Sequence, residues 1–144
     1  MLVGQILKEK AITQTVTIAP DKTIADAAEI LSSKRIGAII VQSGGAGYDG
    51  ILSERDIVRE LGKVGAEVLN LKVSDLMTQK LQVCAPDDTA LAVLERMSTG
   101  RFRHMPVIDK GDLVGLVSIG DVVSARLAEL AMENSALEGM IMGH

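Results

Sequence analysis

The stretch GILSERDIV, Gly50 to Val58, decides the fold because it returns as GLVSIGDVV, Gly115 to Val123. Both copies place a glycine, two apolar residues, a serine, two variable residues, an aspartate and two apolar residues in the same order. Taken alone, the first copy matches a capping box, in which a serine bonds a helix amide and an acidic side chain three positions on bonds back. Many helices with such caps bind no ligand. The duplication adds a second interpretation, a ligand-binding motif presented twice.

The duplication extends upstream of these motifs. Three further pairs of stretches match between the copies. They are VTIAPDKTIADAAEIL from Val16 with QVCAPDDTALAVLERM from Gln82, SSKRIGAIIV with STGRFRHMPVI, and the short leader VGQIL with VSDLM. One copy of about 60 residues would bury little core, so we expect the two copies to share one. The expected organisation is repeat one over 1–62, a linker over 63–72, repeat two over 73–127 and a C-terminal helical extension over 128–144.

Each copy predicts the order strand, helix, strand, strand, helix. In the first copy the expected elements are a strand over 14–18, a helix capped by Asp21 or Thr23, a strand over 36–41, a turn over 42–50, a strand over 51–53 and a helix from Ser53. In the second they are a strand over 81–84, a helix over 89–99, a strand over 105–108, a turn over 109–112, a strand over 113–118 and a helix from Gly120. The fold class is therefore α/β (α+β), with two pseudo-symmetric repeats whose small mixed sheets pack sheet to sheet.

Composition excludes several classes of function. The formal net charge of -4 argues against a phosphate-backbone binder, and Phe102 and Tyr48 are the only aromatic residues, too few to stack single-stranded bases. We therefore expect no nucleic-acid partner. The single cysteine, Cys84, fits a reducing compartment and a small buried apolar residue better than a reactive thiol. Without a signal peptide or an apolar run of spanning length, the chain is expected to be cytoplasmic and away from membranes.

No pattern typical of catalysis or metal binding emerges. GGAG, Gly44 to Gly47, lacks the Lys-Ser/Thr and the helix that follow a phosphate-binding loop, so it is interpreted as a hairpin turn. No serine or cysteine nucleophile with a base, and no metal-ligand cluster, is evident. We expect a protein that is not an enzyme and requires no cofactor.

Taken together, the doubled motif and its flanks resemble a tandem pair of CBS domains, the arrangement called a Bateman module, from Val3 to about Leu127. The resemblance implies a regulatory fold that binds AMP, or alternatively ADP, ATP, NAD(H) or S-adenosylmethionine, in clefts between the repeats. It implies signalling to a regulated partner protein as well. The alternative is a dimeric interaction scaffold that binds no ligand.

The chemistry of the motif agrees with a nucleotide. If Ser53 and Ser118 lie at helix starts, their hydroxyls and the nearby amides face an anion with the positive end of the helix behind them. The carboxylates of Asp56 and Asp121 accept hydrogen bonds, which suits the paired hydroxyls of a ribose. Capping and ligand binding are therefore compatible, since an acid in the first helical turn can also face a cleft.

The resemblance implies further contacts, position by position. Arg103 and His104 would reach phosphates, while their first-copy counterparts Gly37 and Ala38 cannot; a surface pair at a strand end is the alternative for Arg103 and His104. Arg55 would add a cation where the second copy has Gly120, so the two clefts are expected to differ. Slots for the base and the adjoining strands supply the remaining candidates: Thr17, Ile18, Ile39, Val83, Met105 and Pro106.

The tail carries a heptad pattern. Apolar residues recur at alternating spacings of four and three, with one polar member, as in a coiled-coil seam: Val123, Leu127, Leu130, Asn134, Leu137 and Ile141. The pattern predicts a partner helix, or a face that lies on the chain's own domain. The resemblance implies a homodimer through the module helices, which this tail could reinforce.

Overall fold

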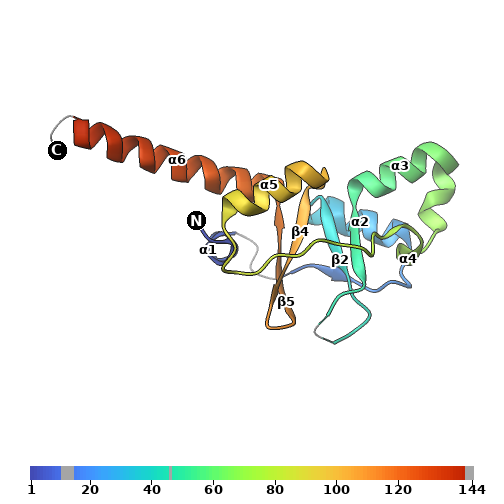
Figure 1. The fold of residues 1–144 in the computed structure, drawn as a ribbon. Coiled ribbons are helices and arrows are strands. Elements are labelled where there is room, and N and C mark those ends of the chain that lie inside the picture. The colour runs from blue at the N-terminus through green and yellow to red at the C-terminus, as the bar shows by residue number, and fades with distance from the viewer. Residues whose placement is uncertain (11–14, 46, 142–144) are drawn as a thin grey trace. The chain divides into compact units, whose positions relative to one another are not determined.

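The structure is a computed structural model that describes residues 1–10, 15–45 and 47–141 (Figure 1). The chain forms two compact units. Unit 1 comprises Met1–Thr13, Val83–Asp109 and Gly115–His144, and unit 2 comprises Gln14–Gln82 and Lys110–Val114. Among the described residues, no helix is both long and apolar enough to cross a membrane.

Unit 2 is built on a three-stranded sheet. The strands β1 (Thr17–Ile18) and β2 (Ala38–Val41) are parallel, and β2 pairs antiparallel with β3 (Gly50–Ser53). All four residues of β2 are buried, as expected for a continuous apolar run. The helical elements of this unit are α2 (Ile24–Lys34), α3 (Glu54–Val64), the 3-10 helix η1 (Gly65–Asn70) and α4 (Val73–Leu76).

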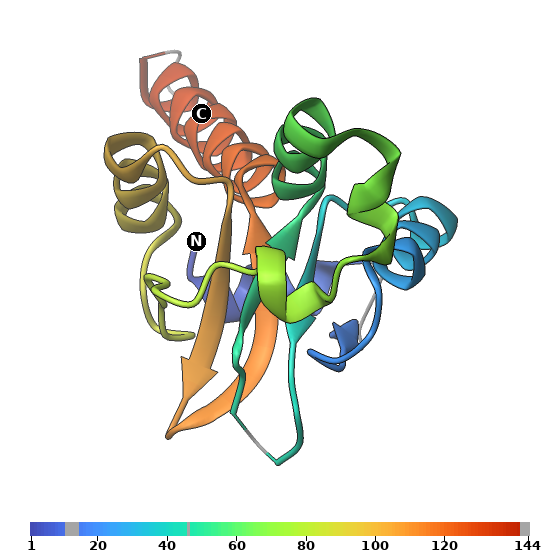
Figure 2. The same ribbon diagram turned by 90° about the vertical axis from the view of Figure 1, so that its right-hand side faces the viewer.

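Unit 1 carries the second set of elements. The strand β4 (His104–Asp109) lies in unit 1, as does β5 (Asp112–Ser118) from Gly115 onward. The two strands form a two-stranded sheet, visible as a long hairpin in Figure 2. The hairpin turns at Lys110 and Gly111, whose φ angles of 52° and 84° are those of a tight primed turn. The helices of this unit are α1 (Val3–Glu9), α5 (Ala90–Gly100) and α6 (Ile119–Ile141).

Equivalent residues begin and end the first helix of each repeat. The hydroxyl of Thr23 accepts a hydrogen bond from the Asp26 amide at 3.2 Å, and that of Thr89 accepts one from the Ala92 amide at 3.1 Å. Thr23, rather than Asp21, is therefore the cap of α2. Both helices end at an arginine in the left-handed region, Arg35 and Arg101, with φ of 54° and 56°. The repetition that is visible in the sequence thus extends to backbone conformation.

Two strand predictions need correction. The first strand is only Thr17–Ile18, and position 14 lies outside the described residues. The strand predicted over 81–84 is wrong, because only Cys84 pairs, in a parallel bridge with Val107. The carbonyl of the preceding residue, Val83, instead accepts a hydrogen bond from Arg96 Nη2 at 2.9 Å. Pro106 stands where the first repeat has Ile40, whose amide donates to the Val16 carbonyl. Because a proline has no amide hydrogen, this second ladder bond cannot form, and no strand extends upstream of Cys84.

The two leaders are exchanged between the units. The leader helix α1 belongs to unit 1, where the amides of Val3 and Gly4 donate to the carbonyls of Asp88 and Pro86, each at 2.9 Å. The leader helix α4 belongs to unit 2 and makes the equivalent bonds: the Val73 amide to Lys22 at 2.8 Å, and the Ser74 amide to Pro20 at 3.0 Å. Each leader therefore packs beside the strands of the other repeat.

Candidate functional site

In unit 2 the Ser-Glu-Arg-Asp motif forms a complete capping box. Ser53 precedes α3, and its hydroxyl accepts a hydrogen bond from the Asp56 amide at 3.3 Å. The Ser53 amide and hydroxyl donate to Asp56 Oδ2 at 2.9 and 3.1 Å, and Arg59 Nη2 donates to Oδ1 at 2.9 Å. Asp56 is only 7% exposed. Both carboxylate oxygens are therefore engaged within the helix start itself.

In unit 1 the equivalent acid has a different cation. The amide of Ser118 donates to Asp121 Oδ2 at 2.9 Å, and Lys10 Nζ lies 3.0 Å from the same oxygen. Partial burial acts to raise the pKa of the Asp121 carboxyl, but the hydrogen bonds from Ser118 and Lys10 outweigh it, so this pKa lies below its usual range. Asp121 is thus ionised at neutral pH and more exposed than Asp56.

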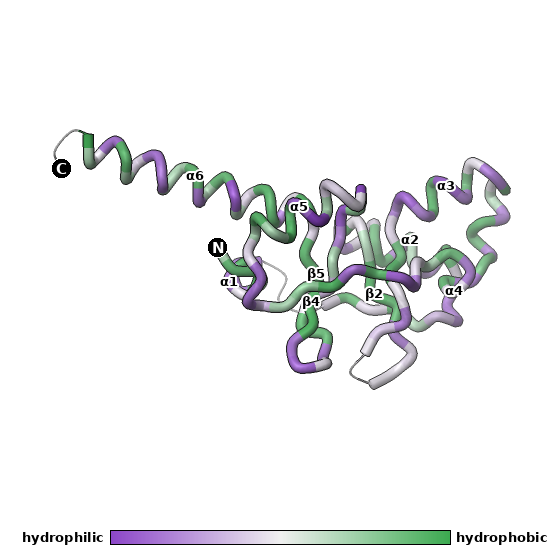
Figure 3. The backbone as a smooth tube through the Cα atoms, viewed as in Figure 1, coloured by the Kyte–Doolittle hydropathy of each residue, from purple (hydrophilic) through white to green (hydrophobic). Residues whose placement is uncertain are grey.

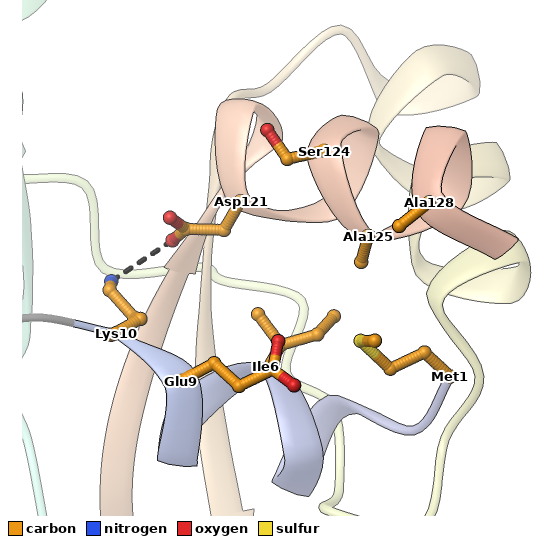
Figure 4. Close-up of a pocket in the computed structure, with 8 residues that line it drawn as sticks. All are labelled: Met1, Ile6, Glu9, Lys10, Asp121, Ser124, Ala125 and Ala128. Atoms are coloured by element: carbon orange, nitrogen blue, oxygen red, sulfur yellow. Dashed lines mark ion pairs between the residues drawn. The ribbon is translucent and has the colours of Figure 1, made fainter. Parts of the chain in front are cut away.

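Asp121 borders a cavity of about 240 Å³ within unit 1 (Figure 4). Figure 4 shows Lys10 and Asp121 at one end of the cavity and Met1 at the other, with α1 on one side and α6 on the other. The walls combine polar groups with small or apolar side chains: Met1, Ile6, Glu9, Lys10, Asp121, Ser124, Ala125 and Ala128. The leader residues of this cavity were not predicted from the sequence.

A sequence signal for Lys10 did exist. The leader VGQILKEK and its counterpart VSDLMTQK both end in a lysine, Lys10 and Lys80. This signal lies outside the doubled motif. Lys10 reaches Asp121 only because its leader packs in unit 1, which the order of residues along the chain does not indicate.

Gly37 and Arg103, which directly precede β2 and β4, occupy equivalent positions, as the match between the repeats predicts. The amide that follows Ser53, on Glu54, donates to the carbonyl of Gly37 at 2.9 Å, and the amide of Ile119 donates to that of Arg103 at 2.8 Å. These bonds correct the expectation of several amides available to an anion, because the first and third amides of each helix are already used. In α3 of unit 2, the second amide, that of Arg55, lies between the two engaged amides of Glu54 and Asp56.

The other candidate residues divide by exposure. Arg55 and Arg103 are exposed, as is Thr17, whereas His104 and Val83 are partly buried. The remaining strand candidates have buried side chains: Ile18, Ala38, Ile39, Met105 and Pro106. Ile39 and Met105 are 0% exposed, so these strand residues can offer a ligand only backbone groups.

Cys84 is a structural residue. It is buried in the core cluster of unit 1, and its Sγ lies 3.7 Å from the Pro106 carbonyl oxygen. Burial, with a contribution from the charge of Asp88, raises the pKa of the thiol to about 11. A thiol that is protonated at neutral pH is a poor nucleophile. Within the described ranges, no group of three or more His, Cys, Asp or Glu side chains could hold a metal ion.

The heptad face of α6 does not lie on its own unit. Val122 and Ala125 are buried on the inner face of the helix, next to α1 and α5. Every apolar member of the seam is exposed instead, with Leu127 at 62%, Leu137 at 57% and Ile141 at 84%. Figure 1 shows the C-terminal half of α6 extending beyond α5, and Figure 3 shows apolar and polar residues alternating along it. The prediction of a face packed on its own domain is therefore wrong.

Comparison with known proteins identifies the class. The model of the CBS domain family matches residues 3–63 and 73–128. The chain therefore belongs to the CBS domain family and carries two CBS repeats, as the sequence resemblance implied. Among solved structures, it is 40% identical to a CBS-domain containing protein from Agrobacterium tumefaciens, with a TM-score of 0.83 over 88% of this chain and 99% of that chain.

Curated relatives support the same assignment. The chain is 35% identical over 127 residues to the mitochondrial CBS domain-containing protein CBSX3 of Arabidopsis thaliana, covering 85% of this chain and 62% of that protein. It is 30% identical over 122 residues to the CBS domain-containing protein YhcV of Bacillus subtilis, covering 85% and 86%. The chain thus spans less than two thirds of CBSX3 and 25% of another Arabidopsis relative.

Proposed function

We propose that this CBS pair is a regulatory module that binds an adenosine-containing ligand and signals the binding of that ligand to a partner protein. The observation that carries the proposal is the ionised Asp121, which is presented at a helix start beside a cavity whose walls are partly apolar. A CBS domain pair of 23% identity and TM-score 0.77 has been crystallised with 5'-methylthioadenosine and S-adenosyl-L-methionine. AMP is the ligand we favour here, with ADP, ATP, NAD(H) and S-adenosylmethionine as alternatives.

In this proposal Asp56 and Asp121 accept hydrogen bonds from the ribose hydroxyls in their respective units. Arg103, His104 and Arg55 contribute positive charge or donors for phosphate groups. The base is recognised by backbone groups near Thr17 in unit 2 and near Val83 in unit 1, because the strand side chains around them are buried. The module is a binding protein rather than an enzyme, and its proposed compartment is the cytoplasm.

Thermal denaturation tests the proposal. A ligand that binds the folded state alone raises the unfolding midpoint by mass action. We expect millimolar AMP, ATP, NADH or S-adenosylmethionine to raise the midpoint of the wild-type protein, and mass spectrometry of the purified protein to identify any bound adenosyl compound. An unchanged midpoint with every ligand, together with no retained small molecule, would reject the sensor.

A second candidate, a dimeric interaction scaffold, is favoured by α6. A row of large exposed apolar side chains along one helix is typical of an interaction surface, so the seam is expected to be covered. We assign the seam to a second copy of the chain, because a heptad face can meet itself across a twofold axis. Asn134 lies at an a position between Leu130 and Leu137, where its amide can both donate to and accept from the same residue of the other copy.

The association of copies is compatible with sensing. A CBS-CP12 protein from bloom-forming cyanobacteria, 26% identical to this chain, is hexameric. If the scaffold were the whole function, the midpoint would rise with protein concentration and stay unchanged with nucleotides. The two candidates are therefore separated by the same denaturation experiment, run at two protein concentrations.

A further inference from the structure

The cation that neutralises Asp121 comes from outside its own helix. Lys10 follows the last turn of α1, and its Nζ is held between two acceptors, Asp121 Oδ2 at 3.0 Å and the Leu116 carbonyl oxygen at 2.8 Å. Figure 4 shows the side chain of Lys10 reaching from the end of α1 to the first turn of α6. The lysine and the acid are each about a quarter exposed, at 29% and 24%, so solvent screens the pair only in part. Lys10 therefore ties the leader helix to the motif.

The occupied oxygen matters for ligand chemistry. A carboxylate oxygen offers about two lone pairs, and Oδ2 already accepts from the Ser118 amide and from Lys10. In bidentate binding, two neighbouring sugar hydroxyls each donate to a different oxygen of the acid. Because Ser118 is fixed as the helix cap, the lysine is the partner that must leave when the second hydroxyl reaches Oδ2.

Unit 2 lacks this arrangement. Lys80, which matches Lys10 in the leader repeat, is exposed, and the cation on Asp56 is Arg59 of the same helix. The residue of α6 that corresponds to Arg59 is Ser124, which has no charge. Unit 2 thus has a cation three residues along its own helix, whereas unit 1 takes its cation from a leader segment distant in sequence.

We propose that Lys10 is a displaceable lock on the sugar acid of unit 1. Without ligand it satisfies Asp121; the ribose hydroxyls replace it, and the release frees the end of α1. This inference rests on the proposed adenosyl-binding function and adds a specific output, a change in the leader segment when unit 1 is occupied. The equivalent exchange in unit 2 would free only a side chain of α3.

The first experiment compares Lys10→Met with wild type in calorimetric titrations with adenosine. Adenosine is chosen because it has no phosphate, to which a released Lys10 could bind and so obscure the effect. Removing the lock removes a competitor of the ribose, so Lys10→Met should bind adenosine about two- to fivefold more tightly, the range of a partly screened ion pair. The matched controls are Lys8→Met, an exposed lysine of the same helix, and Lys80→Met, the repeat counterpart. Both controls should bind adenosine as the wild type does.

The outcomes separate the lock from the function on which it rests. Unchanged or weaker binding by Lys10→Met overturns the lock, and the function stands if Asp121→Asn then removes the adenosine site of unit 1. If neither the wild type nor Lys10→Met binds adenosine, the lock is rejected, and titration of the wild type with AMP decides the function separately.

A second measurement uses the unaltered protein. Lysine acylation by a water-soluble acetylating reagent, followed by peptide mass spectrometry, reports whether Lys10 is engaged. Acylation of Lys10 should rise when adenosine is added, while that of Lys8 stays constant. Acylation of Lys10 that stays constant or falls at saturating adenosine overturns the lock.

Discussion

Arg59 Nη2 lies 2.9 Å from Asp56 Oδ1, so the acid of the first repeat is held by a cation from its own helix while its Oδ2 is bound by Ser53. The acid of the second repeat is held instead by Lys10, from the leader helix. The doubled motif therefore gives two chemically different acids, one buried within its cap and one beside a cavity.

The first prediction concerns ligand affinity. Asp121→Ala and Asp56→Ala each remove the charge-assisted hydrogen bonds that we propose to the ribose, and each loss is worth roughly 1.5 to 3 kcal/mol, about tenfold or more in affinity. We expect each variant to weaken AMP binding in its own unit, measured as affinity and stoichiometry by calorimetry. The control is Asp87→Ala, an exposed acid outside both motifs. Unchanged titrations for both motif variants would defeat the assignment.

The second prediction concerns association through α6. Leu137→Asp introduces a charge into the proposed seam beside Asn134 and should convert the proposed dimer to a monomer, as measured by sedimentation or light scattering. Met132→Asp is the matched control, because Met132 is exposed on the same helix but lies outside the heptad positions. It should remain dimeric. Equal oligomeric states for the two variants would show that the seam does not mediate association.

The third prediction concerns the entry to the motif in unit 2. A Cβ at Gly50 would lie 2.6 Å from the carbonyl oxygen of Thr78, which pairs with Ile51 in a bridge. Gly50→Ala should therefore destabilise the protein by about 1 to 3 kcal/mol in urea unfolding. The control is Gly62→Ala, within α3 and with nothing within 4 Å of the new atom, which should stabilise the protein by about 1 kcal/mol. A neutral Gly50→Ala would contradict the close approach.

The fourth prediction concerns pH. Because the folded-state pKa of Asp121 is lowered, its bonds stabilise the protein above the unfolded-state pKa, and this stabilisation is lost as the pH falls through the folded-state pKa. We expect Asp121→Asn to be less stable than wild type at pH 7, by at most about 1 kcal/mol because the pair is partly exposed, and the difference to shrink at acidic pH.

The control for the pH experiment is built into the comparison. Hydrogen bonding to the ammonium of Met1 lowers the pKa of Glu129, but Glu129 is present in both proteins, so its contribution to the difference cancels. A stability difference that grows as the pH falls would have the wrong sign for a lowered pKa.

Much of the fold could be predicted because the determining signals are local. Three helices are capped by hydrogen bonds to residues three positions away, from Thr23, Thr89 and Ser53. The strand β2 is recognisable as a continuous apolar run. The strand expected up to Cys84 failed for a nonlocal reason, because Pro106 of the neighbouring strand has no amide hydrogen to donate, whereas its first-repeat equivalent, Ile40, donates to Val16. Exposure of the α6 seam also required the structure, since periodicity defines a face but not what lies against it.

The local geometry of the candidate site could be predicted in part for the same reason. Ser53, Asp56, Ser118 and Asp121 could be found because each serine and acid are close in sequence and their pattern occurs twice. Lys10 could not, because it reaches Asp121 across more than a hundred positions and only through the exchange of leaders. Pairing over such a distance leaves no periodicity to detect.

That exchange also constrains how such a chain can be divided. A fragment that ends at residue 72 retains α1 but none of the strands on which α1 packs, and it lacks the α4 that its own sheet uses. The complementary fragment has the reverse deficit. Neither piece contains all the helices of its own unit, so we expect the two pieces, when produced separately, to fold fully only on reassembly, each supplying the helix that the other lacks.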